Sequence, residues 1–189
     1  MKIISHRGND NGKENTKNAI LKSLNKKYID GVEFDIRFTK DKNFVINHNK
    51  TYKGKIISKE NTKALKKLGL NTLKEVLKKI NTNKIIMIEI KDKEESQIKY
   101  LNKILKKYKL NYYICSFNKI IEKINYKKGY ITYIDKTKID KLDFNSINHN
   151  LKINTKKETF VWTINKHNYH KTKYNIITDN PLEIYKKLN

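Results

Sequence analysis

The sequence predicts an α/β fold in which eight parallel strands close into a (β/α)8 TIM-type barrel. Short β-branched runs alternate with lysine-rich helical stretches, and about eight of these runs have the length of a strand. The chain has 189 residues, whereas a barrel of this kind typically needs about 250. We therefore expect a compact barrel with shortened or missing helices in its C-terminal half.

The first half of the chain alternates predicted strands and helices. Strands are predicted at residues 2–5, 31–38, 43–47 and 84–90, and helices at 14–28, 62–68, 72–80 and 93–107. The strand at 31–38 (GVEFDIRF) alternates apolar and polar side chains, as a strand with two different faces does. Thr72-Leu73-Lys74-Glu75 has the pattern of a capping box that opens a helix.

The second half is expected to be poorer in helices. Strands are predicted at residues 111–115, 129–134, 144–148, 159–164 and 174–178, with helices near 118–124 and from Pro181 onward. The connections around 135–143, 149–158 and 165–173 are shorter than the dozen or more residues of a usual parallel crossover. These three connections should therefore be plain loops.

Composition limits the class of protein. We expect one domain over residues 1–189, with a short cap-like insertion around 50–70. The single cysteine, Cys115, excludes a disulfide within the chain and a cysteine-based zinc cluster. No apolar run approaches the roughly 20 residues of a membrane-spanning helix, and the N-terminus lacks the apolar segment of a signal peptide. These features favour a cytoplasmic protein and leave its oligomeric state open.

A net charge of +24 raises the question of nucleic acid binding. Of the 43 cationic residues only Arg7 and Arg37 are arginine, whereas base reading and bidentate phosphate contacts favour arginine. The lysines are spread along the whole chain, and their abundance together with Asn and Ile is typical of an A/T-rich genome. We therefore expect no specific nucleic acid partner, although salt-sensitive contact with an anionic membrane is compatible with this charge. The scarcity of arginine also indicates that a guanidinium is required where one is kept.

Polar side chains follow the predicted barrel strands at the end where the site of a parallel barrel lies. His6 and Arg7 come directly after the first strand, and His48 ends the short run after the second. Glu33 and Asp35 are two positions apart on the second strand, so both point away from its apolar face. Their face should be the barrel interior, where unpaired carboxylates are costly and a bound cation is favoured.

A second pair with this spacing, Glu89 and Lys91, lies at the end of the third strand. With Glu33 and Asp35, Glu89 completes an all-oxygen ligand set of the kind that Mg²⁺ or Ca²⁺ prefers. The two histidines can serve as general acid and general base, and Arg7 and Lys91 can hold a phosphate. This combination predicts phosphodiester hydrolysis.

The remaining aromatic and histidine candidates are weaker. Trp162 lies near the end of a predicted strand, where it can belong to the core and also line the substrate pocket. His149, His167 and His170 each stand outside these motifs in the sequence, and we expect them to be surface or loop residues.

Several short motifs occur in a definite order along nearly the whole chain. They are His6-Arg7-Gly8, Glu14-Asn15-Thr16, GVEFDI at 31–36, Thr39-Lys40-Asp41, His48, TLKEVL at 72–77, Ile88-Glu89-Ile90-Lys91, Ser116-Phe117, VWTIN at 161–165 and IITDNP at 176–181. In this order the motifs resemble those of glycerophosphodiester phosphodiesterases.

The resemblance implies a (β/α)8 barrel and metal-dependent cleavage of glycerophosphodiesters to glycerol 3-phosphate and an alcohol. Carried over by position, it assigns one divalent cation to Glu33, Asp35 and Glu89, general acid/base catalysis to His6 and His48, and the substrate phosphate to Arg7 and Lys91. Attack by water and attack by the neighbouring glycerol hydroxyl, through a cyclic phosphate, both remain open. The leaving alcohol is open as well.

The chain departs from the family pattern at a few positions. Asn49 stands where the family usually has Asp, and Lys13 stands where it favours Pro. The segment at 50–70 is short for the family's cap, so the pocket should be shallow and open. Two alternatives remain: a lysophospholipase-D-like activity at a membrane surface, and a non-catalytic barrel that binds a phosphate-bearing ligand.

Overall fold

The computed structural model describes residues 1–9, 13–165 and 172–189. Eight parallel strands close into a barrel, because the first strand pairs with both the second and the last. In order around the barrel they are β1 (Ile3–Ser5), β2 (Gly31–Phe38), β6 (Ile85–Ile90), β7 (Asn111–Ser116), β8 (Lys127–Thr132), β9 (Phe144–Asn148), β10 (Thr159–Trp162) and β11 (Asn175–Thr178). The predicted (β/α)8 barrel is confirmed.

Alternation along the strands divides the apolar residues into two layers. On β2 the side chains of Val32, Phe34 and Ile36 point outward and pack beneath the helices, with no exposed surface. Inward-facing residues of seven strands, Met87 and Phe160 among them, fill the barrel interior. The polar residues of β2 therefore face the same interior as this second layer, as the alternation predicts.

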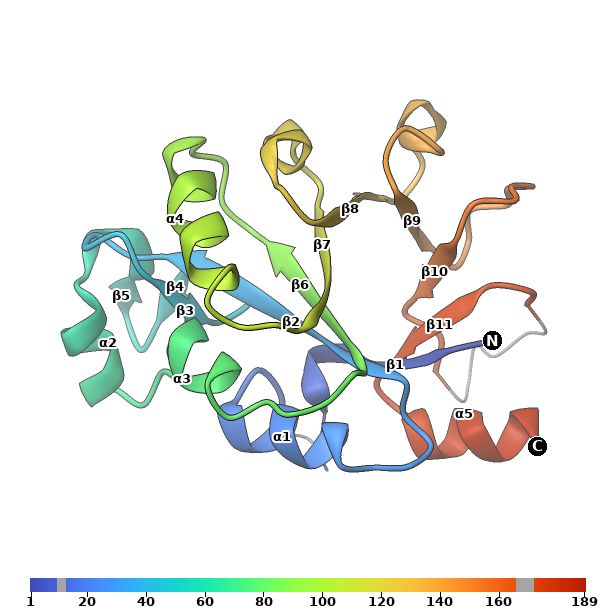
Figure 1. Ribbon diagram of the computed structural model, residues 1–189, viewed down its shortest axis with the longest axis horizontal. Coiled ribbons are helices and arrows are strands. Elements are labelled where there is room, and N and C mark those ends of the chain that lie inside the picture. Colours follow the sequence, from blue (N-terminus) through green and yellow to red (C-terminus); the bar gives the residue numbers. More distant parts are fainter. Residues whose placement is uncertain (10–12, 166–171) are drawn as a thin grey trace.

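Helices cover the first half of the barrel and become sparse in the second (Figure 1). The α-helices are α1 (Lys17–Leu24), α2 (Thr62–Lys67), α3 (Leu73–Leu77), α4 (Ser96–Leu105) and α5 (Pro181–Leu188). After β7 and β8 the connections contain only the short 3-10 helices η3 (Lys119–Lys123) and η4 (Lys136–Lys138). The expected loss of helices is thus observed, while the predicted loop at 165–173 lies largely outside the described residues.

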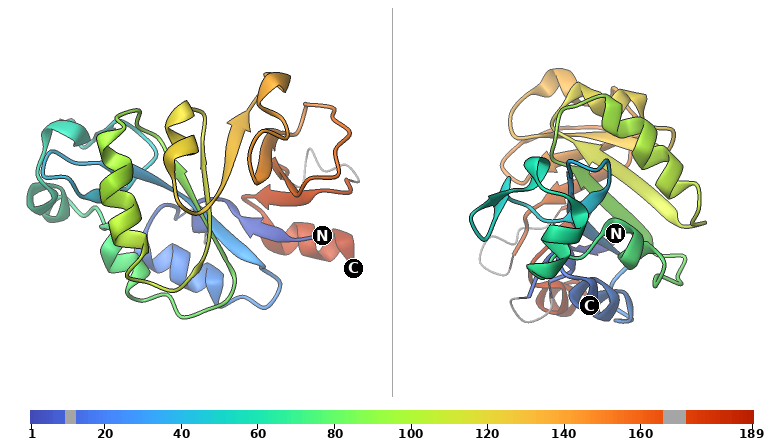
Figure 2. Two further views of the ribbon diagram at one scale, coloured as in Figure 1. Left: turned by 45° about the horizontal axis from the view of Figure 1, so that its top comes forward. Right: turned by 90° about the vertical axis from the view of Figure 1, so that its left-hand side faces the viewer.

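An excursion between β2 and α3 forms one end of the molecule, opposite α5 (Figures 1 and 2). It starts with β3 (Phe44–Ile46), which runs antiparallel to the last residues of β2. A hairpin of β4 (Thr51–Tyr52) and β5 (Lys55–Ile56) follows, then the 3-10 helix η2 (Ile57–Lys59) and α2. Among the described residues, no helix has the length and apolar character needed to cross a membrane.

Several element boundaries differ from the prediction for local reasons. The first helix begins at Lys17 and not at residue 14, because Asn15 has a φ of 50° and Thr16 caps the helix by accepting from the Ala19 N–H. The segment predicted as a helix near 118–124 is the shorter 3-10 helix η3, which buries Ile120 and Ile121 and ends before Ile124, whose backbone is extended.

Candidate active site

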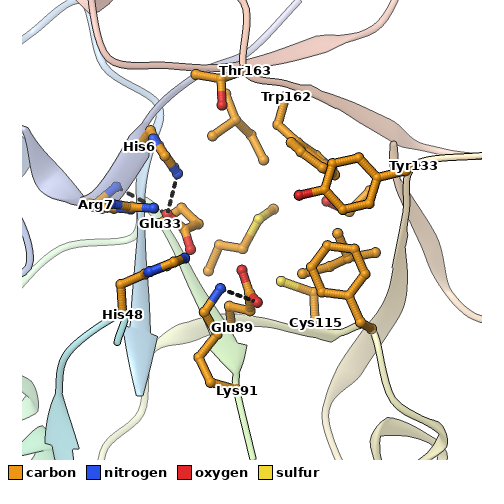
Figure 3. A pocket seen from close by; sticks show the side chains of 15 residues that line it. His6, Arg7, Glu33, His48, Glu89, Lys91, Cys115, Tyr133, Trp162 and Thr163 are labelled. Carbon is orange, nitrogen blue, oxygen red and sulfur yellow. Dashed lines mark hydrogen bonds and ion pairs between the residues drawn. The ribbon is translucent and has the colours of Figure 1, made fainter. Parts of the chain in front are cut away.

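A pocket opens at the C-terminal ends of the barrel strands (Figure 3). His6 enters it from the turn that follows β1. Its Nδ1 lies 2.6 Å from Oδ1 of Asp179, the residue after β11, which pairs with β1. Its Nε2 lies 3.9 Å from Oε2 of Glu33. The ring of His6 is therefore held between two carboxylates.

Arg7 is fixed by the same turn. Its backbone N–H donates to Oε2 of Glu33 at 3.0 Å, its Nη1 donates to Oε1 of Glu14 at 2.7 Å, and its Nε lies 3.4 Å from Oδ2 of Asp35. The turn depends on Gly8, which has a φ of +60° and approaches α1 so closely that a Cβ would lie 2.8 Å from the Cα of Ile20. The family motif His-Arg-Gly thus combines a histidine, a guanidinium and the backbone that brings both to the pocket.

The three carboxylates predicted to bind a cation meet on the floor of the pocket. One oxygen from each of Glu33, Asp35 and Glu89 can be chosen so that all three lie within 4.8 Å of one another. Asp35 and Glu89 are register partners in the parallel pairing of β2 and β6. Lys91 bridges this pair, with Nζ 2.6 Å from Glu89 and 3.2 Å from Asp35.

Asp35 is the most strongly held of the three carboxylates. The Asn15 side chain donates to its Oδ2 at 2.8 Å and accepts from its backbone N–H at 3.1 Å. Burial acts to raise the pKa of Asp35, but Lys91, Asn15 and Arg7 outweigh it and the pKa is lowered. Asp35 is therefore an anion over the physiological pH range.

Glu33 and Glu89 are shifted in the opposite direction. Burial, followed by the charge of Asp35, raises the pKa of both carboxyl groups well above the ordinary value. Three carboxylates this close, of which Glu33 and Asp35 are buried and Glu89 half-buried, repel one another, and a cation between them would relieve that repulsion. The donor set contains only oxygen, which suits Mg²⁺ or Ca²⁺. These residues therefore fit one divalent cation.

The two histidines have different partners. Burial acts to lower the pKa of His6, but the hydrogen bond to Asp179 and the charge of Glu33 prevail and raise it. The ring of His48 has Nδ1 3.0 Å from Oδ1 of Asn49, which is neutral. For His48 burial prevails, and its pKa is lowered. The pocket thus holds one imidazole that favours its proton and one that does not.

Aromatic side chains form the opposite wall of the pocket (Figure 3). Tyr133 stacks on Phe117 with ring centroids 5.3 Å apart, and Trp162 contacts both rings edge-on. Tyr133 and the next residue, Ile134, are 57% and 83% exposed, so the apolar wall continues to the rim. Substrate atoms that are not charged would contact this side.

The structure brings all eight predicted site residues to one place. Seven of them line the pocket, and Asp35 lies beneath it, 1% exposed and in contact with Arg7 and Lys91. The roles assigned to these residues remain predictions. His149 lies half-buried after β9, and His167 and His170 fall outside the described residues.

Sequence reasoning missed four residues that shape the site. Asn15, Phe117 and Asp179 lie within quoted motifs but received no role, and Tyr133 was not considered. A signal existed for Asp179, because it follows the last barrel strand as His6 follows the first. The sequence contained no such signal for Tyr133, because the strand was predicted to continue to residue 134, whereas in the structure it ends at Thr132.

Comparisons with known proteins agree with this arrangement. The Glycerophosphoryl diester phosphodiesterase family matches the chain over residues 6–178. No curated protein sequence matches the chain.

Solved structures share the fold. A glycerophosphodiester phosphodiesterase from Thermotoga maritima is 25% identical, with a TM-score of 0.81 over 99% of this chain and 97% of that chain. A phosphodiesterase from Oleispira antarctica, in complex with the product sn-glycerol-3-phosphate, is 18% identical, with a TM-score of 0.82 over 100% of this chain and 96% of that chain. A glycerophosphodiester phosphodiesterase from Parabacteroides distasonis is 19% identical, with a TM-score of 0.79 over 99% of this chain and 95% of that chain.

Proposed function

Because the chain belongs to the glycerophosphoryl diester phosphodiesterase family, we propose that it hydrolyses glycerophosphodiesters to glycerol 3-phosphate and an alcohol. The observation that carries the proposal is the meeting of three carboxylates, two of them buried, with two histidines and two cationic side chains at one pocket. The Oleispira antarctica phosphodiesterase of similar fold was solved with sn-glycerol-3-phosphate, the product that this reaction would release.

One divalent cation, Mg²⁺ or Ca²⁺, would be held by Glu33, Asp35 and Glu89. When bound, it supplies a Lewis acid that polarises the phosphate and a substrate hydroxyl. Arg7 and Lys91 border the same carboxylates and offer N–H donors to the phosphate oxygens. These two side chains neutralise the phosphate charge and orient it for attack.

The side chains that contact the two histidines, Asp179 and Asn49, support a different role in proton transfer for each ring. His48, whose Nδ1 is occupied by the neutral Asn49, presents an unprotonated Nε2 that accepts the proton of the attacking oxygen. That oxygen comes from water or from the neighbouring glycerol hydroxyl. In the second case a cyclic phosphate forms, and water must then open it to give glycerol 3-phosphate. His6 keeps its proton because Asp179 stabilises the imidazolium, and its Nε2 donates to the leaving oxygen as the P–O bond breaks. The leaving group thus departs as a neutral alcohol.

Hydrolysis assays with defined metals test the proposal. Glycerophosphocholine, glycerophosphoethanolamine and a lysophospholipid are each incubated with Mg²⁺, with Ca²⁺ and with chelator. We expect metal-dependent release of glycerol 3-phosphate, abolished by chelator and lowered at least about 100-fold by Glu33→Ala. Glu158→Gln is the matched control, because Glu158 lies just before β10, at the opposite end of the barrel from the pocket.

The outcomes separate the alternatives. Release of lysophosphatidate from the lysophospholipid alone would indicate a lysophospholipase-D-like enzyme at a membrane. If the folded protein turns over no substrate with either metal, the proposal fails. A non-catalytic phosphate-binding barrel would then be the better account, and Asn49 the first position to examine.

A further inference from the structure

Arg37 is an arginine that the proposed reaction does not use. The chain has 43 cationic residues, and only this one and Arg7 carry a guanidinium. Arg7 belongs to the pocket, where a planar donor suits a phosphate. Arg37 lies on the same side of β2 as Glu33 and Asp35, but beyond the barrel, where β2 pairs with β3. A lysine would serve as well there if only a surface charge were needed.

The guanidinium of Arg37 holds the backbone of His48. Its Nε and Nη2 both donate to the carbonyl oxygen of His48, at 3.0 Å and 2.6 Å. Strand pairing of β3 ends at Ile46, two residues before His48. The Asn47 N–H still donates to the Asp35 carbonyl of β2 at 3.1 Å, and Arg37 ties the carbonyl of the next residue, His48, to the same strand.

The opposite edge of the guanidinium is anchored in turn. Nη1 of Arg37 donates to Oδ1 of Asp92 at 2.8 Å, and the other oxygen of Asp92 accepts from the backbone N–H of Phe38 at 2.7 Å. The Arg37 side chain is 9% exposed and that of Asp92 17%, so water screens this pair weakly. Asp92 follows Lys91 directly, so the anchor joins the chain after β6 to the end of β2.

A lysine in this position would lack the geometry. The fork of a guanidinium places two N–H groups on one acceptor and a third on another, in one plane. An ammonium group is a point charge that moves with a flexible stem. It can neutralise Asp92 without also holding the His48 carbonyl from two directions.

We propose that Arg37, anchored by Asp92, is a positioning residue that fixes His48 for proton transfer. The proposal rests on the proposed function, in which His48 accepts the proton of the attacking oxygen. Arg37 does not touch the pocket, so it acts through the placement of the imidazole. A misplacement of about 1 Å can cost a catalyst as much as about 100-fold in rate.

The first test compares Arg37→Lys with the wild type under metal saturation. We expect kcat to fall by about 10- to 100-fold with KM changed by less than about threefold, because the phosphate-binding groups are untouched. Asp92→Asn should produce a smaller loss of the same kind, since it keeps a hydrogen-bond acceptor for Arg37 but removes the charge. Glu158→Gln, at the far end of the barrel, controls for a loss of stability without displacement of His48.

A double-mutant cycle shows whether the effect passes through His48. His48→Ala alone should lower kcat by about 100-fold or more. If Arg37 acts through His48, the double variant with Arg37→Lys should be no slower than His48→Ala. Losses that multiply in the double variant would overturn the proposal, because Arg37 would then act on another part of the site.

Amide hydrogen exchange provides a readout that does not need activity. In Arg37→Lys we expect exchange at residues 47–49 to accelerate by about tenfold, with protection elsewhere unchanged. Unchanged exchange at 47–49 in a folded Arg37→Lys variant would contradict the positioning role, even if the wild type proved inactive on every substrate. An inactive wild type with accelerated exchange would overturn the proposed function and leave the structural tie in place.

Discussion

At the scale of single residues, the charge of each histidine's partner distinguishes the two rings. The carboxylate of Asp179 lies 2.6 Å from His6, whereas a neutral amide lies 3.0 Å from His48. An anion beside an imidazole favours the imidazolium, and an amide does so much less. One substitution, Asn49→Asp, would give His48 the kind of partner that His6 already has.

We expect Asn49→Asp to move the acidic limb of the pH–rate profile upward. The pKa of His48 is lowered in the wild type, and a carboxylate at position 49 would raise it. In the proposed mechanism His48 must be unprotonated to accept a proton, so activity should rise as the pH rises through its pKa. The limb should therefore shift to higher pH by about one pH unit. The measurement is kcat/KM against pH at saturating metal.

The alkaline limb serves as the internal control for that experiment. In the proposed mechanism this limb reports the loss of the proton from His6, whose contact with Asp179 is not changed by the substitution at position 49. A shift of the alkaline limb with no movement of the acidic one would mean that the two roles are exchanged.

Most of the site residues were predictable, because each follows or lies on a recognisable strand. The alternation over 31–38 placed Glu33 and Asp35 inside the barrel, and the motif after the first strand placed His6. Asp179 was not predicted as the partner of His6, since the two lie 173 positions apart and only closure of the barrel joins them. Contacts made by closure leave no local pattern in a sequence.

At the scale of elements, the helix α3 depends on its capping box. Thr72 accepts from the Glu75 N–H at 3.2 Å, and the Glu75 carboxylate accepts from the Thr72 N–H at 2.9 Å. The helix has only five residues, so these two bonds satisfy a large part of its unpaired N-terminal donors. The backbone before it also pairs with β3, which leads to His48.

Thr72→Ala should therefore lower the free energy of unfolding by about 1 kcal/mol. Thr72→Ser keeps the hydroxyl and should lose much less. Urea denaturation measures both, and kcat should stay near the wild-type value, because the pairing with β3 uses backbone atoms. Equal losses for Ala and Ser would show that the methyl group, and not the cap, provides the stability.

The elements that were predicted well are those with a repeated pattern. All eight barrel strands were placed, because short runs rich in β-branched or aromatic residues recur along the chain. The hairpin of β4 and β5 was missed, since strands of two residues are too short to show a period. The first helix was predicted to begin too early, because Asn15 has a non-helical backbone conformation and its side chain contacts Asp35 in the site.

At the scale of the whole molecule, a polar cluster at the end opposite the pocket joins distant strands. Glu158, just before β10, accepts from Lys2 at 2.7 Å, from Lys127 at 2.5 Å and from the Tyr113 hydroxyl at 2.9 Å. These partners belong to segments at or next to β1, β8 and β7. One carboxylate therefore links strands from across the barrel, including the first.

The stability contributed by Glu158 should depend on pH in a defined direction. Burial acts to raise its pKa, but the hydrogen bonds from Lys127, Lys2 and Tyr113 lower it from 4.5 to about 2. A group whose pKa is lowered by folding stabilises the fold above its unfolded pKa, and that stability is lost as the pH falls towards the folded value. The contribution should thus be full above about pH 5 and disappear between there and about pH 2.

Glu158→Gln measures this directly. We expect the variant to be less stable than the wild type at pH 7, with a difference in the free energy of unfolding that shrinks below about pH 5 and vanishes near pH 2. Glu183→Gln, which removes an exposed carboxylate from α5, should give a small difference throughout. A Glu158→Gln difference that stayed constant from pH 7 to pH 3 would show that shape and packing, not charge, hold this end of the barrel. With the pocket at one end and this cluster at the other, the variant should lose stability while keeping the proposed activity.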